Sequence, residues 1–88
     1  MPKKTWFVYI LRCRDKSLYT GITVDIAARI AAHNAGKGAA YTRSRKPVKL
    51  AWFARQKSES AARKLEAKIK SWNKSEKERF LKSISGSS

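Results

Sequence analysis

The sequence has almost none of the residues that build disulfides and cysteine-rich metal sites. It contains a single cysteine, Cys13. One cysteine excludes an internal disulfide and any cysteine-rich zinc site. Because disulfides belong to oxidising compartments, we expect the reducing cytoplasm as the location of this protein.

Acidic residues and long apolar runs are also scarce. Six Asp and Glu stand against 21 Lys and Arg, which gives a net charge of +15, while 42% of the residues are hydrophobic. No apolar stretch approaches the ~18 residues of a membrane-spanning helix, and we expect no signal peptide ahead of Thr5. An anionic membrane surface is therefore the weaker of two candidate partners. The excess of positive charge makes nucleic acid the first partner to consider.

The length and the apolar pattern predict one small α+β domain. Three short apolar runs predict strands at residues 6–11, 18–23 and 48–54. Helical spacing predicts helices at 25–34 and 58–72, and a short last helix that begins at a capping pair, Ser75 with Glu78. We expect a three-stranded, mostly antiparallel sheet flanked by helices in the order ββαβαα. The domain should span residues 1–84, with a frayed tail at 85–88.

Apolar side chains late in the chain are expected to pack. Trp52 and Phe53 should be core or sheet-face aromatics rather than a base-stacking platform. Phe80 and Ile84 of the last helix should pack back on the core.

The first two strands form a hairpin whose register decides what its tyrosines can do. With a turn of three or five residues, Tyr9 pairs with Gly21, and Tyr19 lies diagonally beside Tyr9 on the same face. Gly21 would then leave an open space above Tyr9. With a register shifted by one residue, the two phenols lie on opposite faces and serve only as sheet packing. Gly21 would then mark a bulge or a bend.

The first helix carries an arginine and a histidine one turn apart. Arg29 and His33 flank the apolar stripe of Ile26 and Ile30, so both can face the sheet. An arginine offers a planar fork of donors that fits phosphate oxygens, and a histidine can take or relay a proton near neutrality. The alternative is a solvated helix edge whose histidine eases the helix dipole. In the first case both tyrosine hydroxyls and the Arg29 guanidinium should point into one shallow cavity.

The loop at residues 36–46 is basic and contains one aromatic residue. Its glycines do not match a phosphate-binding P-loop. An aromatic platform among basic groups suits a nucleic-acid backbone with an unstacked base, whereas the alternative is a solvated loop. The candidate nucleic-acid-binding residues are Lys37, Tyr41, Arg43, Arg45 and Lys46.

The longest predicted helix carries a carboxylate on the flank of its buried stripe. This residue is Glu66, and Asn73 falls about 20° from it around the helix axis, two turns along. The alternative for Glu66 is an ordinary salt bridge to Arg63 or Lys70.

The hairpin also resembles a known signature. Val8-Tyr9-Ile10 followed by Tyr19-Thr20-Gly21 is similar to the paired motif of the GIY-YIG nuclease superfamily, in particular its small stand-alone bacterial proteins. Phe7 and Thr20 replace the first glycine and the second isoleucine of that motif, so the match rests on the two tyrosines, on Gly21 and on later residues. The resemblance covers roughly residues 5–80.

This resemblance implies specific roles for the candidate residues. Catalytic roles are implied for Tyr9, Tyr19, Arg29 and His33. Glu66 would hold the one catalytic Mg²⁺ or Mn²⁺ ion, with Gly21 and Asn73 supporting the site. Arg29 would contact the scissile phosphate, and Tyr9, with His33 as a relay, would orient or deprotonate the attacking water.

The implied function is a metal-dependent endonuclease that hydrolyses DNA phosphodiester bonds. We also expect selectivity for DNA structure and a role in repair or recombination. Because a single carboxylate ligand should bind the metal weakly and a small domain leaves little surface for substrate selection, we expect a protein partner to supply specificity. A non-catalytic, basic DNA- or RNA-binding module is the alternative. A basic protein of structured RNA is less favoured, because it gives Glu66, Arg29 and the tyrosines no common task.

Overall fold

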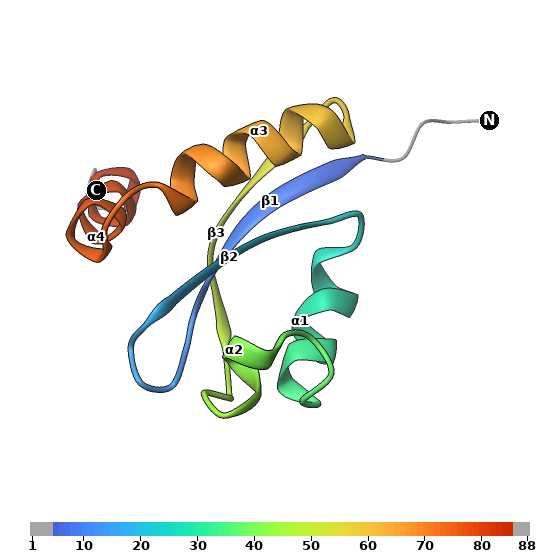
Figure 1. Ribbon diagram of the computed structural model, residues 1–88, viewed down its shortest axis with the longest axis vertical. Coiled ribbons are helices and arrows are strands. Elements are labelled where there is room, and N and C mark those ends of the chain that lie inside the picture. Colours follow the sequence, from blue (N-terminus) through green and yellow to red (C-terminus); the bar gives the residue numbers. More distant parts are fainter. Residues whose placement is uncertain (1–4, 86–88) are drawn as a thin grey trace.

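The centre of the fold is a three-stranded antiparallel sheet with β1 in the middle (Figure 1). The structure is a computed structural model and describes residues 5–85. Its strands are β1 (Trp6–Arg12), β2 (Leu18–Thr23) and β3 (Lys49–Gln56), in the sheet order β2-β1-β3. Its helices are α1 (Ile26–Asn34), α2 (Ala40–Arg43), α3 (Glu59–Lys70) and α4 (Lys74–Ser85).

The expected α+β class and the order ββαβαα are confirmed, with one addition. The short helix α2 forms inside the segment that was expected to be an irregular loop. Ser85 ends α4, and the remaining residues of the expected frayed tail, 86–88, lie outside the described part of the chain.

The central strand β1 is buried on both faces, because its alternating side chains enter two separate cores. Val8 and Ile10 pack with residues of α3 and α4 on one face. Tyr9 and Leu11 face the other way, toward α1. This double burial explains why the strand reads as an unbroken apolar run rather than an alternating one.

The helix starts are fixed by side-chain caps. Asp25 accepts a hydrogen bond from the Ala28 amide at α1, and Ser58 accepts one from the Ala61 amide at α3. At α4 the pair is reciprocal, because Asn73 Oδ1 accepts from the Glu76 amide while Glu76 accepts from the Asn73 amide.

The predicted capping pair of Ser75 and Glu78 is therefore wrong. Because α3 already ends at Lys70, α4 begins at Lys74 and Asn73 takes the cap position, where asparagine is a preferred residue. Glu78 instead forms a two-pronged ion pair with Arg12 of β1.

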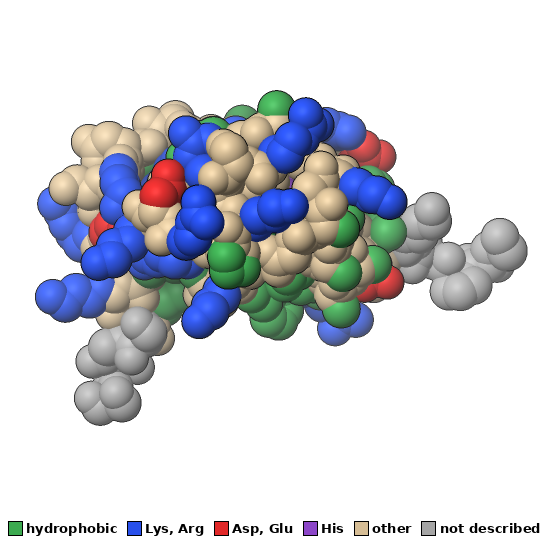
Figure 2. Space-filling view, turned by 90° about the horizontal axis from the view of Figure 1, so that it is seen from below, with side chains coloured by type: hydrophobic (Ala, Val, Ile, Leu, Met, Phe, Trp, Pro, Cys, Tyr) green, Lys and Arg blue, Asp and Glu red, His purple; other side chains and the backbone are tan. Residues whose placement is uncertain are grey.

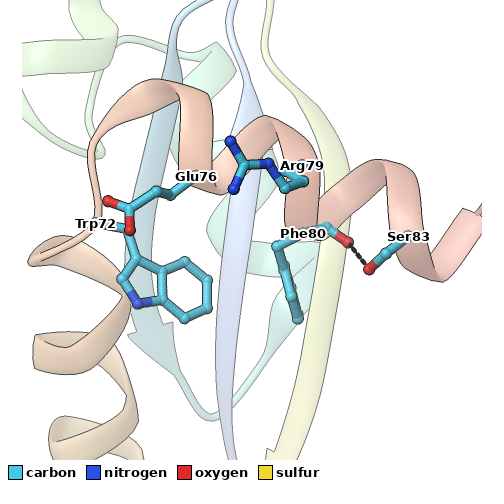
Figure 3. A pocket seen from close by; sticks show the side chains of 5 residues that line it. All are labelled: Trp72, Glu76, Arg79, Phe80 and Ser83. Carbon is cyan, nitrogen blue, oxygen red and sulfur yellow. Dashed lines mark hydrogen bonds between the residues drawn. The ribbon is translucent and has the colours of Figure 1, made fainter.

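Aromatic residues join α4 to the rest of the molecule. Phe80 packs edge-on against Trp52, with ring centroids 5.1 Å apart, and lies 5.3 Å from the ring of Trp72. Trp72 and Phe80 form the apolar part of a surface hollow (Figure 3). The expectation for Ile84 is wrong, because α4 meets the core at Phe80 and Leu81, and Ile84, 44% exposed, lies in its last turn. In the described residues, no helix is both long and apolar enough to cross a membrane.

Candidate active site

The hairpin register brings the two tyrosines to one face of the sheet. Tyr9 pairs with Gly21 and Leu11 pairs with Tyr19 across a turn formed by residues 13–17. The rings of Tyr9 and Tyr19 lie with centroids 6.5 Å apart. The register that requires a turn of three or five residues is thus confirmed.

Gly21 makes room for the phenol of Tyr9. A Cβ atom at Gly21 would lie 2.5 Å from Tyr9 Oη and 3.3 Å from Tyr19 Cε2. Both distances are shorter than ordinary van der Waals contact, so no side chain fits there without displacing Tyr9. The space that Gly21 provides is therefore filled by the Tyr9 ring itself.

Helix α1 aims Arg29 and His33 at this phenol. His33 Nε2 lies 3.1 Å from Tyr9 Oη, and Arg29 Nε donates to the same oxygen at 3.4 Å. His33 is fully buried, which excludes the alternative of a solvated helix edge. Tyr9 is only 1% exposed. Tyr9 and Arg29 therefore meet as expected, but in a closed network rather than in a shallow cavity.

A fourth residue, Thr42 of α2, fixes the direction of the hydrogen bonds. The Thr42 hydroxyl donates to the Ala39 carbonyl at 3.1 Å and lies 2.7 Å from His33 Nδ1. Because its only proton is used, Thr42 accepts from His33 Nδ1–H, and the imidazole must accept at Nε2. Tyr9 therefore donates to His33 and accepts from Arg29.

Thr42 and Gly38 are site residues that sequence reasoning missed. Gly38 lies directly against the His33 ring, where a Cβ atom would overlap Nδ1, and its carbonyl accepts from Arg29 Nη2 at 3.4 Å. Both residues belong to the segment that was expected to be an irregular loop. Its sequence holds no periodicity that could place one hydroxyl or one glycine beside a histidine.

Burial and charge keep this network neutral apart from Arg29. Burial raises the pKa of the Tyr9 phenol; Arg29 opposes the shift, and Tyr19 and Glu66 add to it. Burial also lowers the pKa of His33, and the charge of Arg29 lowers it further. At neutral pH the phenol is therefore protonated and the imidazole is neutral, which agrees with the direction of their hydrogen bond.

The second tyrosine is covered by the segment that carries α2. The Tyr41 ring stacks on Tyr19 with centroids 5.9 Å apart, and the Arg45 guanidinium lies 4.0 Å above the Tyr41 ring. Arg45 also pairs with Asp15 in the hairpin turn, at 3.0 Å. Tyr41 is thus in contact with Tyr19 and Arg45, while 39% of the residue remains exposed.

The other basic residues of this segment are exposed: Lys37, Arg43 and Lys46. Figure 2 views the molecule from the side where α1, α2 and the hairpin turn lie, and shows Lys and Arg side chains spread across it with few acidic ones.

Glu66 makes the ordinary salt bridge that was its alternative reading. Its Oε2 atom lies 3.1 Å from Lys70 Nζ, and its side chain is 18% exposed. Although α3 packs on the opposite face of the sheet from α1, the charge of Glu66 contributes to raising the pKa of Tyr9. Asn73 is not part of α3, and its amide side chain caps α4.

The donor set for a metal ion is small. Among residues 5–85 no group of three or more His, Cys, Asp or Glu side chains could enclose an ion. Magnesium fits such a site, because it retains several waters and is often held by one or two carboxylates plus substrate phosphates. The partly exposed Glu66 carboxylate is suited to this role once its bond to Lys70 opens.

Sequence comparisons find relatives over most of this chain. The family model described as GIY-YIG catalytic domain matches residues 5–79. The UPF0213 protein of Staphylococcus haemolyticus is 47% identical over 85% of this chain and 92% of its own length. A UPF0213 protein of Natronomonas pharaonis is 46% identical over 91% of this chain and 94% of its own. Neither name states an activity.

Solved structures share the fold. The solution NMR structure of a UPF0213 protein from Bacillus halodurans is 40% identical, with a TM-score of 0.60 over 94% of this chain and 87% of that one. A protein of E. faecalis, also solved by NMR, is 36% identical, with a TM-score of 0.64 over 98% of this chain and 92% of that one.

Proposed function

Because the chain belongs to the GIY-YIG catalytic domain family, a family of nucleases, we propose that it is a divalent-metal-dependent endonuclease that hydrolyses DNA phosphodiester bonds. The observation that carries this proposal is the line of hydrogen bonds from Arg29 through Tyr9 to His33. Packing alone requires neither a partly buried cation against a phenol nor a directed proton path. A phosphodiesterase can use both.

Arg29 is the phosphate-binding group in this proposal. Its guanidinium keeps its charge at any working pH, and its two long hydrogen bonds, both 3.4 Å, hold it weakly. A loosely held guanidinium can turn onto the phosphate, where its positive charge stabilises the negative charge that develops in the transition state. Arg29 is therefore suited to bind the oxygens of the phosphate as the new bond forms.

Tyr9 and His33 are the proton path. The attacking water gives a proton to the Tyr9 oxygen while the phenol proton moves to His33 Nε2, and the resulting hydroxide attacks phosphorus. The bond to the leaving oxygen breaks with its electron pair, and that oxygen takes a proton from solvent. Because Tyr9 is only 1% exposed, water reaches its oxygen in this proposal only when Arg29, which contacts that oxygen at 3.4 Å, moves onto the phosphate. The half-buried Tyr19 is the phenol that orients this water at the surface of the site.

Glu66 is the residue that would hold the divalent ion, Mg²⁺ or Mn²⁺. When bound, such an ion supplies Lewis-acid stabilisation of charge on the phosphate and on the leaving oxygen. Gly21 supports the site by admitting the Tyr9 ring. The position of Asn73 at the α4 cap gives no support to its direct participation.

The proposal also includes the nucleic-acid substrate, a protein partner and the cellular location. The charge of +15 favours nucleic acid, bound in part through Lys37, Arg43 and Lys46. We include selectivity for DNA structure, a role in repair or recombination, and a protein partner that supplies specificity, because a domain this small offers little surface of its own for substrate selection. The single buried, free cysteine is compatible with a cytoplasmic location.

The test compares wild type with Glu66→Gln on single-stranded, duplex, flapped and branched DNA, with Mg²⁺ or Mn²⁺. Glu66→Gln should abolish cleavage while DNA affinity stays equal or rises slightly, since a negative charge leaves a phosphate site. Arg29→Ala should slow cleavage roughly a hundredfold or more.

Glu59→Gln is the matched control. Glu59 lies on the same helix and also pairs with a basic residue one turn along, Arg63, yet it has no place in the proposed site, so its cleavage rate should equal that of wild type. A wild type that cuts none of these substrates, or a Glu66→Gln variant that cuts equally well, would leave the non-catalytic nucleic-acid-binding module.

A further inference from the structure

The sheet face that carries Tyr9 also carries an exposed aromatic ring, that of Phe53 on β3. Phe53 of β3 pairs directly with Tyr9 of β1, so the two side chains are neighbours on the same face. Phe53 is 51% exposed, the largest value among the exposed large hydrophobic side chains of the described residues. Helix α1 packs its Ile26 and Ile30 in the core that contains Tyr9 and leaves Phe53 outside that core.

The core does not explain this ring. The preceding residue, Trp52, lies on the opposite face, where it packs against Phe80. Phe53 contacts Phe7 edge-on, with ring centroids 5.9 Å apart and an interplanar angle of 64°. Phe7 thus supports Phe53 from the side and fixes its orientation.

Positive charge lies along the same strand and face. Arg55 is exposed and pairs with Phe7, two residues along β1 from Tyr9, so it projects from the same face as Phe53. An exposed aromatic ring with basic groups around it is the usual platform for unpaired bases, since every base has a face that can stack.

We propose that Phe53 is a base-stacking site for an unpaired DNA nucleotide next to the phosphate held by Arg29. The site itself needs no catalysis, but its link to a scissile phosphate rests on the proposed function. A duplex keeps its bases stacked inside the helix, so a ring on a sheet surface can receive a base only from single-stranded, frayed or flapped DNA. The platform therefore selects substrates with unpaired bases near the cleavage point.

A second copy of this chain is the rival occupant of the face. Its charge argues against it, because two copies that each carry +15 repel one another. A nucleotide brings both a ring for Phe53 and a phosphate for the neighbouring Arg55.

The test is binding of oligonucleotides that contain the fluorescent base 2-aminopurine, measured in EDTA so that cleavage plays no part. Wild type should quench the base in single strands more than in duplexes. Phe53→Leu should weaken single-strand binding roughly tenfold, the loss of one stacked base, and should leave duplex binding and the salt dependence unchanged, because no phosphate contact is removed. Phe53→Trp should retain both binding and quenching.

Ile84→Ala is the matched control, since Ile84 is a similarly exposed apolar residue, 44%, on α4. It should bind the oligonucleotides as wild type does.

An RNA oligonucleotide of the same sequence tests whether the site is specific for DNA. A general stacking surface would bind the RNA and the DNA equally, whereas the proposed site should prefer the DNA. Equal RNA and DNA binding would overturn the assignment to DNA.

Three other results would overturn the platform itself. In the first, Phe53→Leu binds single strands as wild type does. In the second, it loses single-strand and duplex binding equally. In the third, sedimentation shows that wild type is a dimer and Phe53→Leu a monomer. Because the assay needs no cleavage, an inactive wild type with a clear Phe53 effect would reject only the nuclease. An active wild type without a Phe53 effect would reject only the platform.

Discussion

His33 shows at the scale of one residue how burial sets chemistry. Both of its ring nitrogens are committed, Nδ1 to Thr42 and Nε2 to Tyr9, and no part of the side chain reaches solvent. Protonation would place a charge inside the protein beside Arg29 and would turn the Tyr9 contact from a donor–acceptor pair into two donors. The folded state therefore favours the neutral imidazole.

This preference predicts how stability depends on pH. The pKa of His33 is lowered in the folded protein, whereas an unfolded histidine titrates near about 6.5. The contribution of His33 is complete above that value and is lost as pH falls below it, because the unfolded chain binds the proton first. Urea denaturation at pH 7, 6 and 5 should show stability falling by up to about 1.4 kcal/mol per pH unit.

His33→Gln separates this effect from other titrations. The variant is expected to be less stable at pH 7, yet its stability should change little between pH 7 and 5. An identical pH slope in both proteins would mean that His33 is not the group responsible.

At the scale of elements, the β1–β2 hairpin places the site. Its register puts Gly21 under Tyr9, and the alternation of β2 puts the neighbouring Thr20 on the other face. The Thr20 hydroxyl is buried and, within the described residues, has no hydrogen-bond partner. Two adjacent positions of one strand therefore make opposite demands: one forbids a side chain, and the other tolerates the loss of a hydroxyl.

Paired substitutions in β2 test this arrangement. Gly21→Ala should lower the free energy of unfolding by about 1–3 kcal/mol, because the new methyl group overlaps Tyr9. Thr20→Val should leave stability equal or raise it by about 1 kcal/mol, since it removes an unsatisfied buried group at nearly constant volume. Chemical denaturation of both variants measures the difference. A Gly21→Ala variant as stable as wild type would show that Tyr9 is not held against β2.

For the whole molecule, the dominant property is its charge. Ion pairs in the described residues use several of the few carboxylates, for example Glu78 with Arg12 and Asp15 with Arg45. The six acidic side chains are too few to pair with the 21 Lys and Arg side chains, so most of the positive charge is not neutralised within the protein. The surface is therefore a strong, unspecific attractor for polyanions.

Affinity for nucleic acid should accordingly fall steeply with salt. Neutralising three phosphates of a duplex would weaken binding about 40-fold between 50 and 200 mM salt. Arg43→Ala should reduce the slope of log affinity against log salt by roughly one, because Arg43 is exposed in the basic segment beside the site. Arg63→Ala, on α3 and already paired with Glu59, should change the slope less. Titration at several salt concentrations measures both, and a salt-independent affinity would contradict the electrostatic account.

The sequence by itself determined the three strands and the three longer helices, but it left two hairpin registers open, only one of which puts both tyrosines on the same face. Alternation along β1 and β2, and the helical spacing of Arg29 and His33, depend on periods of a few residues. These periods were readable without a structure, and so was the pairing of Tyr9 with Gly21 once a turn of odd length was assumed.

Tertiary structure decided what those residues touch. Thr42 reaches His33 only because α2 folds back onto α1, and the tautomer of the histidine follows from that contact. Asn73 caps α4 rather than extending α3, and α4 is held in place by Phe80 against Trp52 and by Glu78 against Arg12. Whether a strand aromatic such as Phe53 is buried or free depends on how far a helix extends across the sheet, and no local pattern in the chain records that distance.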